Sequence, residues 1–309
     1  MVRPAAGRSR PLAASNRTGT GVLLRLTRMK DGLIKYGLAA LAVLLVGPLS
    51  TQLLSLSMSS SGLRAVPAFN STTPVVALVA TLLIAAAALL IGAAAAKFVG
   101  LRWGLVCTGL ALLWPAGTVT PLAELMQEVS PGSPVGVLLI DNALLGVIAV
   151  VIGFVLQRLA RDRERFVAGR IPLLPAGVVG IAIAAACGVG ALVFIALSAR
   201  GGQAIFAAVC AGALAGQLLR AFVVPAPVWT VLLGLALVSV VGPVAVMISG
   251  KSGGELARLI NADSAPALIR ILGWQWLAGG TLGLGIGLSW NAAQLEQMPL
   301  AGETRPAQA

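Results

Sequence analysis

A chain of 309 residues with 58% hydrophobic and only 10% charged side chains is not an ordinary soluble protein, in which about 25% of residues are charged. The formal net charge of +12 would suit a nucleic-acid partner, but the basic residues gather between apolar segments and near the chain ends, so we expect no nucleic acid. The sequence has no histidine, which excludes histidine-ligated haem, histidine zinc sites and Ser-His or Cys-His catalytic pairs.

Eight long apolar segments with almost no internal charge dominate the sequence. Each is close to the roughly 20 residues that cross about 30 Å of hydrocarbon as a helix. The bilayer core offers no water, so the backbone must bond to itself, and a helix does so within one segment. The sequence therefore predicts an all-α, polytopic integral membrane protein with about eight transmembrane helices. The segments are Ile34–Leu54, Pro74–Ala96, Leu101–Val119, Pro134–Leu156, Pro172–Leu197, Gln203–Val224, Pro227–Ile248 and Leu268–Trp290.

The basic residues predict the orientation of these segments. Most of the 22 Lys and Arg residues lie in residues 1–35, 97–102 and 157–170, which all fall on one side of the predicted membrane. Because cytoplasmic loops carry such an excess, we expect both termini inside (N-in, C-in). Residues 1–30 are then a basic, disordered cytoplasmic tail, 31–292 the helical bundle and 293–309 a short cytoplasmic tail. Basic residues on that face would attract anionic lipid headgroups.

The segment before Asp31 also bears on location. It is rich in Arg, Ser and Ala and has no acidic residue. This composition is typical of a positive-inside tail and also of an organelle transit peptide. We favour the inner membrane of a bacterium, with an organelle membrane as the alternative.

Three connections on the predicted outer side are long: residues 55–73, 120–133 and 249–267. In the last, Leu256, Leu259 and Ile260 fall on one helical face, which predicts a short interfacial helix. Several other connections have only a few residues, so the helices that they join should be antiparallel neighbours.

Asp141 is the one carboxylate well inside a predicted helix, about 10 Å from its start at about 1.5 Å per residue. A charged group in such a place is a candidate for cation binding, proton relay or substrate binding. Asn142 follows it, and Gln275 falls at similar depth in the last helix. We therefore hypothesise an outward-facing polar site of Asp141, Asn142 and Gln275, with Gln203 as a further candidate. The alternatives are hydrogen bonds that only join helices, or a later start of the helix that leaves Asp141 at the wet interface.

Two rows of glycine at four-residue spacing predict close helix packing. Such rows let helix backbones approach each other in lipid, which favours a dense bundle or a homo-oligomer. The row in the last helix is Gly279, Gly283 and Gly287, and the row in the sixth is Gly212 and Gly216.

Prolines and cysteines inside the apolar segments have simple interpretations. Pro48, Pro115 and Pro243 predict kinks or helix ends, with a broken helix that exposes carbonyls to a substrate as the alternative. The three cysteines match no metal or redox spacing, so we expect packing thiols and neither a metal nor a cofactor.

Two function classes are compatible with these features, and neither is an enzyme, because no catalytic motif is present. A more distant third is an enzyme that acts on lipid-linked substrates through Glu124, Glu128 or Glu255 in the outer loops, which no motif supports. The first is a carrier or channel for a small solute or ion, with Asp141, Asn142 and Gln275 along the path. The second is a non-catalytic structural or scaffold subunit of a membrane protein complex. The first requires a water-accessible polar path, whereas the second predicts a dry bundle and partners in the membrane.

Overall fold

The computed structural model describes residues 32–127, 134–160, 175–197, 201–221 and 226–297, with the backbone alone for 291–297. Within these residues every regular element is a helix, and β-pairing is limited to an isolated bridge between Met58 and Arg64. The predicted all-α class is therefore confirmed for this part of the chain. The predicted tail 1–30 and most of the tail 293–309 lie outside the described residues.

Helices form at all eight predicted apolar segments. Six of them are long and apolar enough to cross a membrane: the first helix, α3, α6, α7, α8 and α9. The chain therefore has the helices of a multi-pass membrane protein. The eight helices are Gly32–Leu54, α3 (Pro74–Phe98), α4 (Leu101–Thr118), α6 (Pro134–Leu159), α7 (Ala176–Phe194), α8 (Gly201–Ala221), α9 (Val228–Ile248) and α11 (Gly273–Gln297).

The two helices outside that set of six, α4 and α11, lie inside the bundle. Helix α11 packs against α8, α4, α6 and α9, and every residue from 273 to 285 is buried. Helix α4 packs against α3 and α11. A helix that faces protein instead of lipid tolerates more glycine and polar residues, which explains why these two sequences are less apolar.

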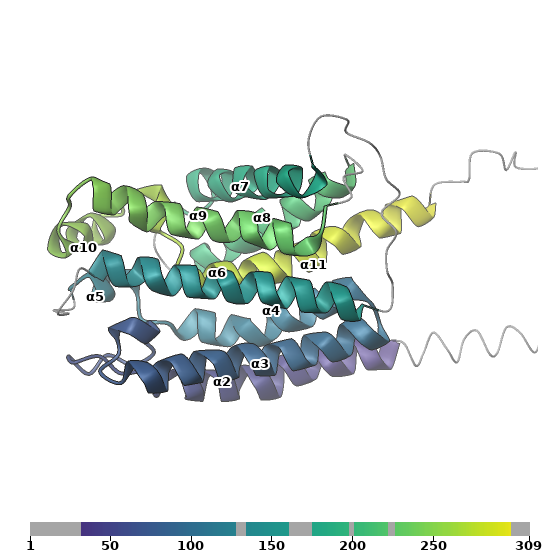
Figure 1. Cartoon of the computed structure of the whole chain (residues 1–309), viewed down its shortest axis with the longest axis horizontal. Helices are drawn as coiled ribbons and strands as arrows, with labels where there is room; N and C mark the ends of the chain where they lie inside the picture. The colour runs from purple at the N-terminus through teal and green to yellow at the C-terminus, as the bar shows by residue number, and fades with distance from the viewer. Residues whose placement is uncertain (1–31, 128–133, 161–174, 198–200, 222–225, 298–309) are drawn as a thin grey trace, which may run out of the picture.

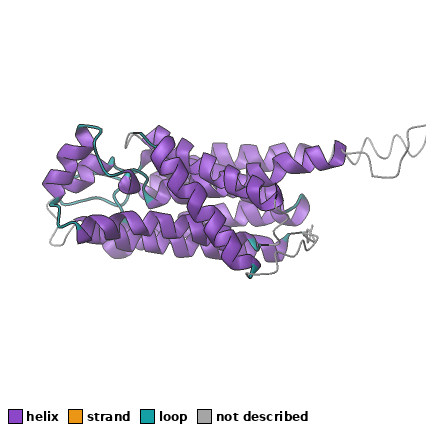
Figure 2. Ribbon diagram, turned by 90° about the horizontal axis from the view of Figure 1, so that it is seen from above, coloured by secondary structure: helices purple, strands orange, loops and turns teal. Residues whose placement is uncertain are grey.

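The long helices run along one axis, and two short helices lie at one end of the bundle (Figure 1). The short helices are α5 (Leu122–Gln127) and α10 (Gly253–Asn261), which pack against each other. The beginning of the first helix and the end of α11 lie at the opposite end (Figure 1). Figure 2 shows the same arrangement from above, with loops gathered beside the short helices. We call the end that carries α5 and α10 the cap end.

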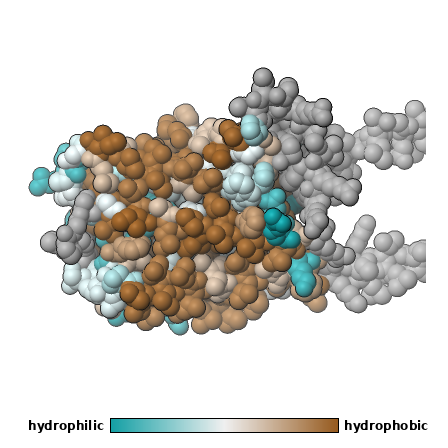
Figure 3. All heavy atoms as spheres, viewed as in Figure 1, coloured by the Kyte–Doolittle hydropathy of each residue, from teal (hydrophilic) through white to brown (hydrophobic). Residues whose placement is uncertain are grey.

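The outer surface has the distribution that a membrane requires. Apolar residues cover the middle of the visible face, and hydrophilic residues gather toward its ends (Figure 3). Large apolar side chains point outward from the peripheral helices, as Leu44 does with 73% of its surface exposed. In water such a surface would be costly, whereas in lipid it is expected.

The first helix contains a π-helical turn, Ala42–Val46, directly before Pro48. The Gly47 N–H donates to the Ala42 carbonyl, a bond that spans one residue more than in an α-helix. Proline lacks an N–H and clashes with the preceding turn, and the wider turn accommodates it without ending the helix. Pro115 and Pro243 also lie inside continuous helices, α4 and α9.

The cap end contains one helix that was predicted and one that was not. The predicted interfacial helix is α10, whose apolar face buries Leu256, Ala257 and Ile260. Its first turn is capped by Ser252, whose hydroxyl accepts a bond of 3.3 Å from the Glu255 N–H. Helix α5 lies within a stretch predicted only as a long connection.

Helix α11 differs from its prediction at both ends. It begins at Gly273, because residues 267–269 form a separate 3-10 turn after Pro266, and not at Leu268. It ends at Gln297, past the residue 292 that was predicted to close the bundle.

Both glycine rows lie in the contact between α8 and α11, each against the other helix. A Cβ on Gly279 would lie 2.6 Å from the Ala208 Cβ, and one on Gly212 would lie 2.8 Å from the Leu284 amide nitrogen. Such separations are shorter than van der Waals contact, so only glycine permits this approach of the two backbones.

Candidate functional site

Asp141 lies on α6 with 5% of its surface exposed and joins the helix to the long connection before α3. Its two carboxylate oxygens accept bonds from the Ala68 N–H at 3.0 Å and the Phe69 N–H at 3.4 Å. These residues form a short 3-10 turn, Ala68–Asn70, that packs on α3 and α6. In this conformation the carboxylate fixes the connection before α3 to the bundle.

Asn142, which is 2% exposed, joins three helices. Its side-chain nitrogen donates to the Ser239 carbonyl of α9 at 2.8 Å. Its side-chain oxygen accepts a bond of 2.9 Å from the Gly273 N–H, at the first residue of α11. One amide therefore satisfies two buried backbone groups that have no partner within their own helices.

Gln275 caps the start of its own helix. Its side-chain oxygen accepts a bond of 2.8 Å from the Leu272 N–H. Because the oxygen accepts this bond, the side-chain nitrogen remains available as a donor. It lies 3.6 Å from the position that a Cβ on Gly201 would take. Gln275 is 4% exposed, and that small surface contributes to a pocket at the cap end.

The structure therefore brings together only part of the predicted polar site. Asn142 and Gln275 accept from successive N–H groups, those of Gly273 and Leu272, at the start of α11. Asp141 instead contacts the connection before α3. Gln203 donates to the Ile195 carbonyl beyond the end of α7. Within the described ranges, no three His, Cys, Asp or Glu side chains gather into a group that could hold a metal ion.

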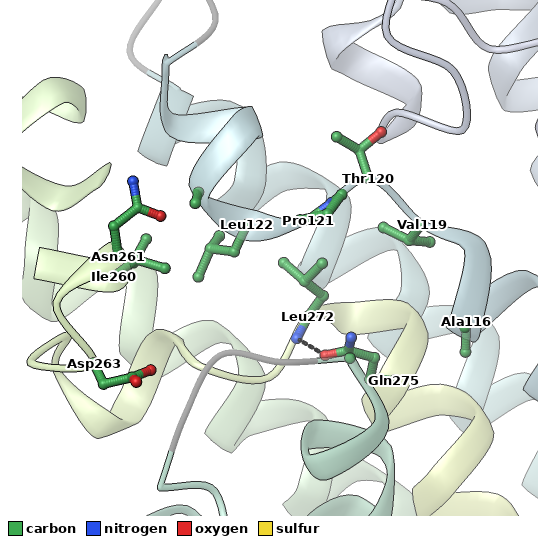
Figure 4. A pocket seen from close by; sticks show the side chains of 13 residues that line it. Ala116, Val119, Thr120, Pro121, Leu122, Ile260, Asn261, Asp263, Leu272 and Gln275 are labelled. Carbon is green, nitrogen blue, oxygen red and sulfur yellow. Dashed lines mark hydrogen bonds between the residues drawn. The ribbon is translucent and has the colours of Figure 1, made fainter. Parts of the chain in front are cut away.

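The pocket has a volume of about 470 Å³ and lies beneath the short helices of the cap end (Figure 4). Helices α5 and α10 form its outer wall, and the end of α4 and the starts of α8 and α11 form its floor. Apolar side chains line slightly more than half of it. These are Ala116, Val119, Pro121, Leu122, Ala123, Ile260 and Leu272.

The polar groups of the pocket stand at its edges. Asp263 is the one ionisable side chain among the described lining residues, and Asn261 and Gln275 contribute amides. Thr120 also lines the pocket, but its hydroxyl donates to the Arg64 carbonyl at 2.6 Å. The pocket therefore has a mixed lining, with apolar walls, one negative charge and two amides, which is compatible with a small-molecule site.

Asp263 owes its position to the way in which α10 ends. Its backbone has φ of 53°, a left-handed conformation that aspartate and asparagine tolerate better than most residues. Its N–H donates to the Ile260 carbonyl at 3.0 Å, which closes the last turn of the helix. Sequence analysis did not single out Asp263, because an acidic residue in a polar loop carries no periodic signal.

Arg270 anchors the segment that runs from Asp263 to α11. Its guanidinium donates to the Ala265 carbonyl at 2.6 Å and 3.0 Å, and to the Ala196 and Leu197 carbonyls at 2.9 Å each. The last two follow the end of α7, where a cation is favoured by the helix dipole. The wall of the pocket on this side is thus fixed to a neighbouring helix.

No protein-family model, curated protein or solved structure matches this chain. Any function must therefore be inferred from the fold and the pocket alone.

Proposed function

We propose that the chain is a carrier or channel for a small solute, with eight membrane-spanning helices and the pocket at the cap end as its external binding site. In this proposal α4 and α11 span the membrane as inner helices, in addition to the six that are apolar enough by themselves. Both termini are cytoplasmic. The protein resides in the inner membrane of a bacterium, with an organelle membrane as the alternative.

The orientation is supported by side chains at the end of the bundle opposite the cap. Lys35, Lys97 and Arg158 lie there; Lys35 follows the basic residues of 1–30, and Arg158 precedes those of 161–170. Lys35 also stands 5.9 Å from the ring centre of Trp103, and indole favours the membrane interface. These side chains would contact anionic lipid headgroups, and the cap end would face outward.

The pocket is the observation that carries the proposal. Its volume of about 470 Å³ lies within the roughly 300–1,000 Å³ of small-molecule sites. Gln275, which was expected to line a transport path, has its amide at the floor of this pocket.

Passage beyond the pocket would require α8 and α11 to separate. Below the floor the two helices are in backbone contact at their glycines, which leaves no room for a solute in this conformation. The structure would therefore correspond to a state that is closed on the cytoplasmic side. A glycine contact suits such a movement, because it has no interlocking side chains to disengage.

The second candidate function is a non-catalytic scaffold subunit, with a homo-oligomer or other membrane proteins as partners. It is favoured by Asp141 and Asn142, because their side chains bond to backbone groups of the bundle and do not line a solute path. In either function we propose no catalytic activity, no cofactor and no nucleic-acid partner.

Cysteine accessibility separates the two candidates. Gly117 lines the pocket, and a Cβ there would have no atom within 4 Å, so Gly117→Cys is compatible with the fold. The variant is made in a chain without Cys107, Cys187 and Cys210 and is treated in intact cells with a membrane-impermeant thiol reagent. Labelling supports an external solute site. Absence of labelling would favour a sealed scaffold, and Leu44→Cys, which faces lipid, serves as the unlabelled control.

A further inference from the structure

The pocket has opposite polar character on two sides, and this limits what it can bind. On one side are Asp263 and Asn261, at and just after the end of α10 (Figure 4). A helix C-terminus carries partial negative charge, so the end of α10 and the Asp263 carboxylate act in the same direction. This side favours a positive group that can donate hydrogen bonds.

The other side offers a hydrogen-bond donor. The Leu272 N–H holds the side-chain oxygen of Gln275, which fixes the orientation of the amide. Figure 4 shows the amide nitrogen of Gln275 on the side that faces the pocket. Helices α8 and α11 begin here, at Gly201 and Gly273, and a helix N-terminus carries partial positive charge. This side favours an acceptor, such as a carboxylate, a carbonyl or a hydroxyl.

Between the two sides the walls are hydrocarbon. Leu122, Ile260 and Leu272 project toward the centre of the pocket in Figure 4. An inorganic cation would lose its hydration against such walls without gaining a full set of oxygen ligands, since the described lining residues provide a single carboxylate. A short methylene chain would instead find apolar contacts along its length.

From these three features we infer that the pocket binds a small organic amine, with its ammonium group at Asp263 and Asn261, its aliphatic part against the apolar walls and an acceptor group at Gln275. The inference rests on the proposed function, in which the pocket opens to the outside, and adds the chemical class of the solute. An anion of the same size would meet the negative charge of Asp263 and bind more weakly.

The first test measures the electrostatic preference of the pocket with reagents of known charge. Gly117→Cys is treated with a trimethylammonium methanethiosulfonate and with a sulfonate methanethiosulfonate, and the two labelling rates are compared. We expect the cationic reagent to react faster, and Asp263→Asn to lower the ratio of the two rates about fivefold, the size of an exposed ion pair. Asparagine also tolerates the left-handed backbone of residue 263, so the fold should be retained.

The matched control is Glu255→Gln. Glu255 lies on the same short helix, is exposed and does not line the pocket. The substitution removes one negative charge from the same end of the molecule as Asp263→Asn does. Its effect on the rate ratio therefore measures the contribution of the general surface potential. We expect it to leave the rate ratio unchanged, and an effect equal to that of Asp263→Asn would overturn the assignment of Asp263.

The second test uses three solutes of similar length as protectants of Gly117→Cys: ε-aminocaproate, hexylamine and caproate. We expect ε-aminocaproate to protect best, hexylamine less and caproate least. Gln275→Leu should remove the advantage of ε-aminocaproate over hexylamine, whereas Asp263→Asn should weaken protection by both amines. Equal protection by all three solutes, or best protection by caproate, would overturn the inference.

The outcomes separate this inference from the proposed function. If neither reagent labels Gly117→Cys, the pocket is closed to the outside, and the proposed function fails together with the inference. If both reagents label it at equal rates and Asp263→Asn has no effect, the pocket is open but does not select amines. In that case the proposed function stands and the inference is wrong.

Discussion

The contact between α8 and α11 can be tested by adding a single methyl group. A Cβ on Gly283 would lie 2.9 Å from the Ala213 amide nitrogen and closer still to the Val209 carbonyl oxygen. Both are backbone atoms, so a rotamer change on α8 would not relieve the clash and the helices must move apart. We expect Gly283→Ala to destabilise the folded protein by about 1–3 kcal/mol, the usual cost of overpacking a tight interface.

The matched control is Gly190→Ala on α7, where a Cβ would meet no atom within 4 Å. Alanine has a higher helix propensity than glycine, so this change should be neutral or slightly stabilising. The assay is thermal unfolding of the protein in detergent, followed by tryptophan fluorescence. Gly283→Ala should lower Tm by about 3–8 °C, while Gly190→Ala leaves it unchanged or raises it. Equal Tm values for the two variants would refute the close backbone contact.

Three further predictions follow from buried polar contacts. Asp141→Asn leaves one side-chain oxygen to accept from two N–H groups and turns an NH₂ group toward the second. Hydrogen exchange at the Ala68 and Phe69 amides should therefore become faster, while the amides of α6 stay protected. Unchanged exchange at both amides would contradict the role of Asp141 in fixing the connection before α3. Asn142→Leu keeps the side-chain volume roughly constant but removes the hydrogen-bond partners of the Ser239 carbonyl and the Gly273 N–H. It should lower the free energy of unfolding by about 2–4 kcal/mol. Its Tm should therefore fall below that of the control Ser55→Ala, which removes an exposed hydrogen bond. Arg270→Gln can keep only part of the hydrogen bonds to the carbonyls of Ala196, Leu197 and Ala265. Proteolytic cleavage near residues 263–270 should therefore become faster than in the wild type. A wild-type cleavage rate would show that these bonds do not anchor the segment.

Most of the helices could be predicted from sequence because the bilayer imposes a length and an apolar composition on each span. Pro74 and Pro134 mark the beginnings of α3 and α6, as expected for proline at the first helical position. The start of α11 could not be predicted in the same way. Apolar residues begin at Leu268 and continue on both sides of Arg270. The helix nevertheless begins only where Asn142, 131 residues earlier in the sequence, caps the Gly273 N–H.

The pocket was the least predictable feature. Asp141 stood out in the sequence because it interrupts an apolar helix, yet its partners are backbone N–H groups 72 and 73 residues away, which no local pattern reveals. Asp263 drew no attention because acidic residues are common in loops. Its place in the pocket depends on how α10 packs on α5 and how the segment after it is anchored by Arg270.

Labelling of Gly117→Cys in intact cells tests the central claim most directly, because Gly117 lines the pocket and has open space where the new side chain would lie. A pocket that opens to the outside predicts rapid modification by the impermeant trimethylammonium reagent in a chain without the three native cysteines, with no modification of Leu44→Cys. Modification only after the membrane is permeabilised would place the cap end inside and contradict the orientation. No modification under either condition would contradict the existence of a solute site at this end of the bundle.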